Sequence, residues 1–209
     1  REKGLWESIT DGVRYATSIR NVVGMDWNAQ VGQLFAMQHG RDNLNNWGGM
    51  FTDSVSAELP AEEFLLVKQG SDFGWPYCYY DPFQKKKMLA PEYGGDGKAV
   101  GDAKAPTRCT GKDQPVMAFP GHWAPNDLLF YTGRQFPEKY RNGAFICFHG
   151  SWNRAPMKQA GYFVAFVPFK NGKPAGDYEV FAEGFAGGPE TASPADAKHR
   201  PMGLAQGSD

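Results

Sequence analysis

Arg20 and Asn21 stand directly before the apolar stretch VVGMDWN (residues 22–28). The guanidinium of an arginine is planar and permanently charged, which suits an anionic or quinonoid ligand. A plain surface turn is the alternative interpretation of this pair. If the first interpretation holds, Arg20 points at such a ligand.

A second polar group, HGRD (residues 39–42), ends the stretch GQLFAMQHG. A glycine such as Gly40 lets the backbone direct its carbonyl oxygens toward one point, as a hard cation such as Ca²⁺ requires. Glu62 and Glu63 could add carboxylates to the same ion. The alternatives are an ordinary turn for residues 39–42 and a solvated loop for the paired glutamates.

Two clusters combine aromatic and polar residues beside apolar stretches. His122 and Trp123 lie in FPGHWAPND, and Trp152, Asn153 and Arg154 lie in HGSWNR. Core packing explains each of them singly. The sequence contains no GxSxG, HExxH, phosphate-binding loop or GxGxxG, so motif-based hydrolase, zinc-protease and nucleotide-binding functions have no support.

The composition indicates which elements must position these residues. The chain has 209 residues, 41% hydrophobic, with 26 Gly, 15 Pro and a net charge of −1. Gly and Pro punctuate hairpins and break helices, so we predict an all-β fold. The balanced charge gives no indication of a basic surface that would bind nucleic acid or an anionic membrane. No stretch is apolar enough to span a bilayer, and the amino end has no signal peptide, so we expect the native start to be missing.

Alternating and apolar runs predict the strands, and turn residues separate them. Residues 82–116 are polar and rich in Gly and Pro, and we predict a long loop excursion there. Asn171 and Gly172 form a hairpin-type turn. The predicted strands lie within VVGMDWN (22–28), GQLFAMQHG (32–40), EEFLLVKQG (62–70), DLLFYTG (127–133), GAFICFHG (143–150), GYFVAFVPF (161–169) and YEVFAEGF (178–185).

The three cysteines have no metal-ligand spacing. Cys147 lies in an apolar run and is predicted to be a buried free thiol. Cys78 and Cys109 flank a polar loop, and a disulfide between them would form in an oxidising compartment; the sequence leaves this pairing open.

Weakly similar units recur along the chain, each with polar residues just before an apolar strand. They begin at SIRNVVGMDW, at HWAPNDLLFYTG and at HRPMGLAQGSD. Such recurrence is typical of a β-propeller, whose blades pack on their neighbours around a central channel. We predict one domain, residues 1–209, that is an incomplete portion of a propeller of roughly three blades, at about 40 to 50 residues each.

Taken together, several motifs resemble the bacterial glucose/sorbosone dehydrogenase family, and especially its sorbosone dehydrogenase-like branch. The resemblance runs over essentially the whole chain and implies kinship with soluble glucose dehydrogenase, a six-bladed propeller that uses pyrroloquinoline quinone (PQQ) and Ca²⁺ to oxidise sugars in the periplasm. The motifs are SIRNVVGMDW, QHGRDNL, EEFLLVKQGSDFGWPYCYYDP, APEYGGDGK, FPGHWAPNDLLFYTG, FHGSWNRAP and HRPMGLAQGSD.

The resemblance implies roles for individual residues. The family's quinone-contacting Arg-Asn pair falls on Arg20 and Asn21, and Arg20 would polarise the quinone oxygen in catalysis. The carbonyls that ligate the cofactor calcium fall on Gly40 and Arg41. An acidic pair that helps to hold a structural calcium falls on Glu62 and Glu63, although here Phe73 replaces the tyrosine of the following corner and residues 43–61 form an insertion.

Further cofactor-binding positions follow from the same resemblance. Two segments that close over the cofactor fall near His122 and Trp123 and on Arg200, with Lys198 nearby. A family lysine falls on Asn153, and we expect the neighbouring Arg154 to supply the cation instead.

The family's histidine base belongs to blades that this chain does not contain, so none of the four His takes that role. The resemblance implies hydride transfer from a sugar to PQQ, a cytochrome c as possible electron acceptor, and a periplasmic or secreted location. We expect the isolated chain to be marginally stable and inactive. A non-catalytic calcium-binding propeller is the main alternative, and a calcium-dependent lactonase is a more distant one.

Overall fold

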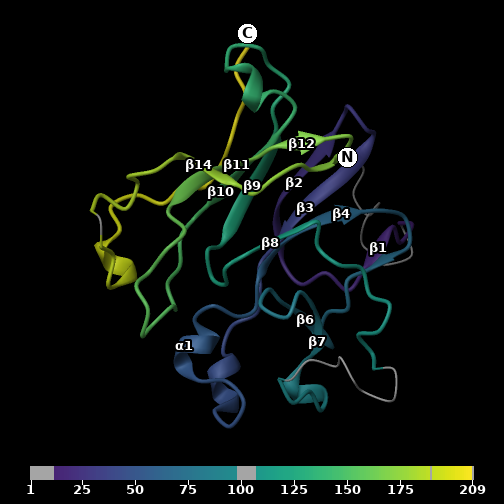
Figure 1. The fold of residues 1–209 in the computed structure, drawn as a ribbon, viewed down its shortest axis with the longest axis vertical. Coiled ribbons are helices and arrows are strands. Elements are labelled where there is room, and N and C mark those ends of the chain that lie inside the picture. The colour runs from purple at the N-terminus through teal and green to yellow at the C-terminus, as the bar shows by residue number, and fades with distance from the viewer. Residues whose placement is uncertain (1–11, 98–106, 189, 209) are drawn as a thin grey trace, which may run out of the picture.

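The computed structural model describes residues 12–97, 107–188 and 190–208. Its two largest sheets are four-stranded and antiparallel (Figure 1). In the first sheet the strand order is β2-β3-β4-β8, with β2 at Val22–Asn28, β3 at Gln33–Gln38, β4 at Glu62–Val67 and β8 at Met117–Phe119. In the second the order is β14-β11-β10-β9, with β9 at Pro125–Phe130, β10 at Ala144–Phe148, β11 at Phe163–Val167 and β14 at Glu179–Ala182.

Shorter elements decorate these sheets. Two-stranded pairs are formed by β1 (Ala16–Thr17) with β5 (Ser71–Asp72), β6 (Cys78–Asp81) with β7 (Lys86–Leu89), and β12 (Phe169–Lys170) with β13 (Lys173–Pro174). The helical segments are α1 (Asp53–Ser56) and the 3-10 turns η1 (Leu44–Trp47), η2 (Pro91–Tyr93), η4 (Glu138–Tyr140) and η5 (Pro194–Asp196). No helix among the described residues is both long and apolar enough to cross a membrane.

The all-β prediction is confirmed, and every predicted strand segment contains an observed strand. β10 (AFICF) is buried along its whole length, as its unbroken apolar run predicts. Asn171 and Gly172 both have positive φ, at 53° and 73°, and join β12 to β13. β9 starts two residues before the predicted segment, because Pro125 already pairs with Phe148 of β10.

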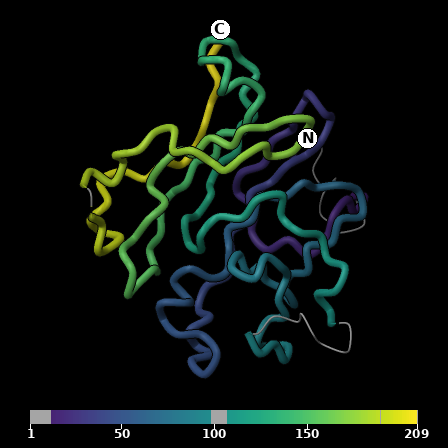
Figure 2. Tube along the Cα trace, in the orientation of Figure 1, coloured from purple at the N-terminus to yellow at the C-terminus, as the bar shows by residue number. Residues whose placement is uncertain are grey.

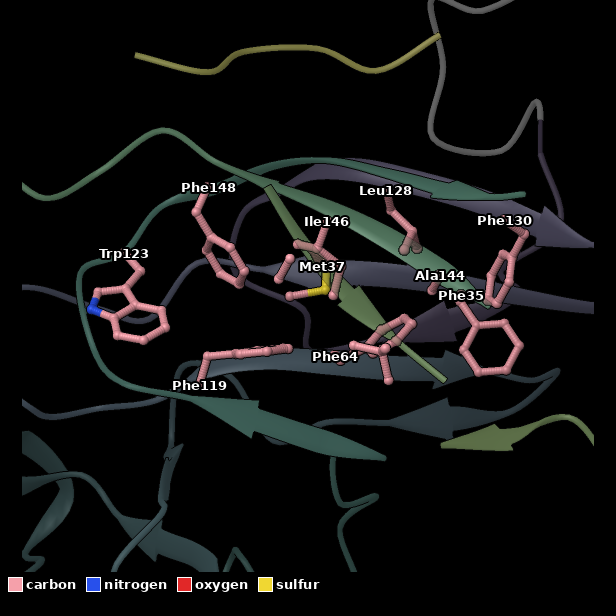
Figure 3. Close-up of a cluster of buried hydrophobic side chains, with 12 residues drawn as sticks. Phe35, Met37, Phe64, Phe119, Trp123, Leu128, Phe130, Ala144, Ile146 and Phe148 are labelled. Carbon is pink, nitrogen blue, oxygen red and sulfur yellow. The ribbon is translucent and has the colours of Figure 1, made fainter. Parts of the chain in front are cut away.

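The main core lies between the two sheets (Figure 3). Phe35 of β3 and Phe64 of β4 meet Phe130 of β9, and the ring centroids of Phe35 and Phe130 are 5.0 Å apart. Figure 3 places Trp123 at one end of this cluster and Phe130 at the other. Burial of these rings stabilises the arrangement of one sheet against the other.

The sheets come closest where β2 crosses β9. A Cβ atom added at Gly24 would lie 2.6 Å from the carbonyl carbon of Asp127, so only glycine fits there. The Asp26 carboxylate accepts a hydrogen bond of 2.7 Å from the Phe130 backbone N–H. The two sheets therefore adjoin through their first strands, as neighbouring propeller blades do, and the trace in Figure 2 follows the chain from one to the other.

On its other face β2 presents an apolar stripe to solvent. Val23, Met25 and Trp27 alternate along the strand and are 46%, 59% and 54% exposed. In a propeller this is the face that an adjacent blade covers.

The excursion of residues 82–116 is more structured than its composition predicts. β7 lies within it and pairs with β6, and Met88 is buried against Tyr79 and Leu44 in a small second core. Cys147 is a buried free thiol, as predicted, and the Cys78–Cys109 pairing that the sequence left open is a disulfide. Residues 98–106 of the excursion lie outside the described residues.

Candidate functional site

The turn of residues 39–42 follows β3 and packs against the start of β4. The Gly40 N–H donates to Glu62 Oε2 at 2.9 Å. A Cβ added at Gly40 would lie 2.8 Å from the Pro60 carbonyl oxygen and 2.9 Å from that of Ala61. This close approach is what requires glycine, and it fixes the path of the turn.

Arg20 reaches this turn from the residues before β2. Its Nη1 donates to the carbonyl oxygens of Gly40 at 2.9 Å and His39 at 3.4 Å. Its Nη2 lies 3.8 Å from Asp42 Oδ2, and its Cζ lies 5.6 Å from the centre of the Trp75 ring. The guanidinium is thus held between carbonyls, a carboxylate and an indole, which fixes its plane.

Asn21 contributes through its backbone. Its carbonyl oxygen accepts a 2.9 Å hydrogen bond from the His39 N–H, which ties the two turns together. The His39 ring bonds to the Pro125 carbonyl at 2.9 Å through Nε2. Burial lowers the pKa of His39 below its usual range, so this ring is neutral at pH 7.

Asp42 joins three segments that are far apart in the sequence. Its Oδ1 accepts from Asn153 Nδ2 at 2.6 Å and lies 3.3 Å from His122 Nδ1, and its Oδ2 faces Arg20. The hydrogen bond from His122 is the main cause that lowers the pKa of Asp42. Asp42 is therefore an ionised hub between the two sheets.

His122 is buried and uses both ring nitrogens as donors. Nε2 lies 2.8 Å from the Ser56 carbonyl and 3.1 Å from the Leu59 carbonyl, and Nδ1 faces Asp42. Carbonyl oxygens only accept hydrogen bonds, so this arrangement suits the protonated ring. Burial works against the charge, but the bonds to Asp42 and Ser56 outweigh it and raise the pKa of His122.

Glu62 lies beneath the turn and is buried, with 2% of the residue exposed. Its carboxylate accepts from the N–H of Gly40 at 2.9 Å and from that of Ala124 at 3.2 Å. Burial raises the pKa of Glu62 to about 7, and the two N–H donors oppose that rise. Glu62 can therefore hold or release a proton near neutral pH.

Glu63 points to the opposite face of β4, as successive strand residues do. Its carboxylate pairs with Lys87 Nζ at 2.5 Å and accepts from Gln38 Nε2 at 3.0 Å. Burial raises the pKa of Glu63, and the Lys87 ammonium opposes this. The structure does not bring the two adjacent carboxylates together.

Asn153 and Arg154 have different surroundings although they are adjacent. Arg154 is buried, and its Nη1 donates to the carbonyls of Ala57 and Gly121, each at 2.9 Å, while Nη2 pairs with Glu58. Arg154 thus stabilises neighbouring loops. Asn153 lies beside Asp42, and its Oδ1 is buried with no hydrogen-bond partner among the described residues.

The remaining predicted residues lie away from Asp42 or face other partners. Trp123 packs in the main core, 5.6 Å from Phe148 between ring centroids. Arg41 pairs with Glu92 at 2.5 Å. Arg200 donates to the carbonyls of Gly150 and Pro194 and lies over Tyr162, and the aliphatic part of Lys198 lies beside Gly187.

Six predicted residues line one small cavity, which we call the central hollow: Arg20, Asn21, Gly40, Glu62, His122 and Asn153. Four further residues line it, His39, Asp42, Trp152 and Ala124. His39 and Asp42 lie in the HGRD motif and Trp152 lies in HGSWNR, but no role of its own at the site was predicted from the sequence for any of the three. Ala124 left no signal in the sequence, although its φ of 56°, like the 68° of His122, marks an unusual turn.

A second cavity adjoins the central hollow and shares Arg20 and Asp42 with it. We call it the aromatic hollow, and its other lining residues are Arg41, Asn43, Trp75, Pro76, Glu92 and Tyr93. No group of three or more His, Cys, Asp or Glu side chains within residues 12–97, 107–188 and 190–208 is arranged to hold a metal. Asp42 and Glu62 line the central hollow, so an ion there would need carbonyl or amide oxygens as further ligands.

The chain is similar to known proteins over most of its length. The family model described as TrAA12-like matches residues 1–209. An uncharacterized protein of Borreliella burgdorferi is 28% identical over 173 residues, which are 81% of this chain and 38% of that protein. A pyrroloquinoline quinone-dependent pyranose dehydrogenase of Coprinopsis cinerea is 25% identical over 158 residues, which are 72% of this chain and 20% of that protein.

Two solved structures share the fold. The iodide structure of the Trichoderma reesei Carbohydrate-Active Enzymes Family AA12 protein superposes with a TM-score of 0.65 at 22% identity, over 91% of this chain and 48% of that one. The holo form of the pyranose dehydrogenase PQQ domain from Coprinopsis cinerea gives a TM-score of 0.61 at 20% identity, over 90% and 49%. The chain spans about half the length of these structures.

Proposed function

The chain belongs to the TrAA12-like family, and from that premise we propose that it forms part of a PQQ-dependent sugar dehydrogenase. The observation that carries the proposal is the fixed guanidinium of Arg20, held against the Gly40 carbonyl and beside Trp75 at the central hollow. A related Coprinopsis cinerea protein bears the name of a pyrroloquinoline quinone-dependent pyranose dehydrogenase. The reaction and its sugar belong to the whole protein.

The residues of the central hollow suit a planar, anionic quinone. Arg20 offers a rigid fork of donors, which matches carboxylate or quinone oxygen. Asn153 Nδ2 and the exposed side chain of Asn21 border the same cavity. We propose that Arg20, Asn21 and Asn153 contact PQQ there. Arg200 would be a more distant carboxylate partner, whereas Arg154 would act by holding the loops.

The central hollow also has oxygen atoms of the kind that Ca²⁺ prefers. The buried, unpartnered Oδ1 of Asn153, the Gly40 carbonyl and the Asp42 carboxylate belong to residues of the central hollow. Hard cations prefer such oxygens. We propose Ca²⁺ ligation by the carbonyls of Gly40 and Arg41, with Glu62 close by. Glu63 is outside this proposed site, because Lys87 and Gln38 already occupy its carboxylate.

PQQ, when bound, supplies a hydride acceptor for the carbinol carbon of the sugar. The residues of this chain then provide orientation and electrostatics. Arg20 stabilises negative charge that develops beside it, because its guanidinium is already fixed by Gly40 and Asp42 before reaction. Buried His122 directs Nδ1 toward Asp42, and buried Glu62 accepts from the Gly40 N–H, so both hold the turn around Asp42 in place.

Finer features of the proposal come from the resemblance stated earlier. We propose a sorbosone-like or other aldose substrate, transfer of electrons to a cytochrome c, and a periplasmic or secreted location. The Cys78–Cys109 disulfide is consistent with an oxidising compartment.

The test is a titration of the full-length protein with PQQ in Ca²⁺ and in chelator, followed by dye reduction over a panel of aldoses and sorbosone. We expect calcium-dependent PQQ binding and sugar-driven dye reduction. The Arg20→Lys variant should lose most of the activity, because an ammonium cannot reproduce the fork, while Arg14→Lys at an exposed position should not. Absence of PQQ binding in both conditions would contradict the proposal.

A further inference from the structure

We propose that the aromatic hollow is a binding subsite for a neutral sugar, with Tyr93 and Glu92 as its specificity-determining residues. The inference rests on the proposed function, since it places the substrate beside Arg20. It assigns a role to residues of the excursion, none of which was expected at the site. Its basis is the combination of aromatic faces, balanced charges and a wall held by hydrogen bonds.

Aromatic side chains supply the apolar surface of this hollow. Tyr93 is 43% exposed, and its ring centroid lies 4.7 Å from that of Tyr77. Trp75 lines the same hollow and lies beside the Arg20 guanidinium. A sugar ring carries C–H groups on its faces and hydroxyls on its rim, so it stacks on such aromatic surfaces while its rim reaches polar groups.

The charges of the hollow are paired, and this favours an uncharged ligand. Arg41 pairs with Glu92 at 2.5 Å, and Arg20 faces Asp42 at 3.8 Å. Two guanidiniums and two carboxylates leave no net charge among the lining side chains. A sugar hydroxyl both donates and accepts hydrogen bonds, so it can use both members of each pair, whereas an anion would meet as much repulsion as attraction.

The turn that carries Glu92 and Tyr93 is held by backbone hydrogen bonds, one of them from the Tyr93 N–H to the Ala90 carbonyl at 2.9 Å. Both residues lie in η2, whose following Gly94 N–H bonds to the Pro91 carbonyl at 3.0 Å. The Cys78–Cys109 disulfide anchors the excursion, and Arg108 lies 4.2 Å above the Tyr77 ring. The volume of about 330 Å³ suits one sugar ring, and a prearranged wall lowers the entropy lost on binding.

The first test measures sugar binding without any cofactor, so that it does not depend on the dehydrogenase reaction. D-glucose and D-glucuronate are titrated into the full-length protein and followed by saturation-transfer NMR. We expect glucose to bind, with a Kd about fivefold weaker in Tyr93→Ala. Phe83→Ala, at a 69% exposed aromatic elsewhere in the excursion, is the matched control and should bind as the parent does.

A second variant changes the charge of the hollow and is expected to improve the binding of an anionic sugar. Glu92→Gln keeps the shape of the side chain but leaves the Arg41 charge unbalanced. We expect this variant to shift its preference toward glucuronate by about fivefold. Unchanged glucose binding in Tyr93→Ala together with an unchanged preference in Glu92→Gln would overturn the subsite.

Kinetics separate this inference from the proposed function. In the protein loaded with PQQ and Ca²⁺, Tyr93→Ala should raise KM for glucose while kcat and PQQ affinity stay the same. Glucose binding that Tyr93→Ala weakens, in a protein in which no sugar drives dye reduction, would contradict the proposed dehydrogenase function and support the subsite. If turnover occurs and Tyr93→Ala changes neither KM nor glucose binding, the subsite fails alone.

Discussion

At the residue scale, the hub formed by Asp42 sets the charge state of its neighbours. Burial opposes a charge on His122, but the Asp42 carboxylate and two carbonyls around the ring favour its protonated form and raise its pKa. The ion pair in turn keeps Asp42 ionised and available to Arg20. The protonation of one buried ring therefore helps to define the position of the arginine on which the proposed function rests.

Asp42→Asn is predicted to lower the pKa of His122. The amide keeps the size of the side chain but removes the negative charge that favours the imidazolium, so burial then dominates. The measurement is an NMR titration of the His122 ring protons. Asp177→Asn, at an exposed position, is the control and should leave the titration unchanged. A His122 pKa that is the same in both variants would contradict the role of Asp42.

The raised pKa of Glu62 predicts that the stability of the protein depends on pH. This pKa is raised from 4.5 to about 7, so the folded state binds this proton more tightly than the unfolded state does. The free energy of unfolding should therefore fall as pH rises from about 4.5 to 7, by about 3 kcal/mol from this group. Urea unfolding of the parent and of Glu62→Gln across this range measures this loss. As the pH rises, the free energy of unfolding of the parent should fall relative to that of the variant. A constant difference would show that Glu62 is ionised throughout.

At the element scale, the closest contact between the sheets is the crossing of β2 and β9. Gly24→Ala should lower the free energy of unfolding by about 1–3 kcal/mol, because the new methyl group meets backbone atoms that cannot move aside. Gly176→Ala is the matched control, since its Cβ would be 3.5 Å from the nearest atom. Equal stability of the two variants, measured by urea unfolding, would mean that the crossing is looser than the structure indicates.

Most strands were predictable because their apolar runs are long and bounded by turn residues, as in β2, β4 and β10. The short strand β7 was not, because KKML looks polar until Met88 is placed against residues from distant loops. A pairing of this kind depends on tertiary contacts, which local pattern does not contain.

Site residues were predictable from the sequence where a motif restricts the backbone. They were less predictable where their role depends on the direction of the side chain. Arg20, Gly40 and Glu62, each singled out in the sequence, line the central hollow together. For Asn153 and Arg154, which are adjacent in an irregular loop, the sequence could not tell which side chain faces the hollow. Glu92 and Tyr93 approach Arg20 only through the folding of the excursion, so no local signal marked them.

At the scale of the whole molecule, the disulfide closes a large loop. Cys78 and Cys109 are separated by 31 residues, and the bridge restricts the unfolded chain. The double variant Cys78→Ser and Cys109→Ser should be less stable by about 2–4 kcal/mol. Calorimetry under oxidising conditions measures this, and the buried Cys147→Ala variant serves as the control for loss of a thiol. A stability equal to that of the parent would show that the loop is restrained by other contacts.

The apolar stripe on β2 affects the behaviour of the isolated 209-residue chain. Val23, Met25 and Trp27 are exposed together on a strand at the edge of its sheet, and such surfaces associate with other chains. We predict concentration-dependent self-association of this chain, reduced by Met25→Lys and Trp27→Lys. Phe83→Lys, elsewhere on the surface, should have no such effect. Sedimentation velocity measures the outcome, and a monomer at all concentrations would contradict it.

The anchoring of the excursion also has an evolutionary consequence. The disulfide joins both ends of the segment, while Lys87 pairs with Glu63 of β4 and Met88 packs in the second core, so these inner residues must be kept. Natural selection could therefore vary the outer residues of the segment, altering the wall beside Arg20 while its inner contacts are inherited. Diversification of such proteins would then be concentrated in one covalently closed loop.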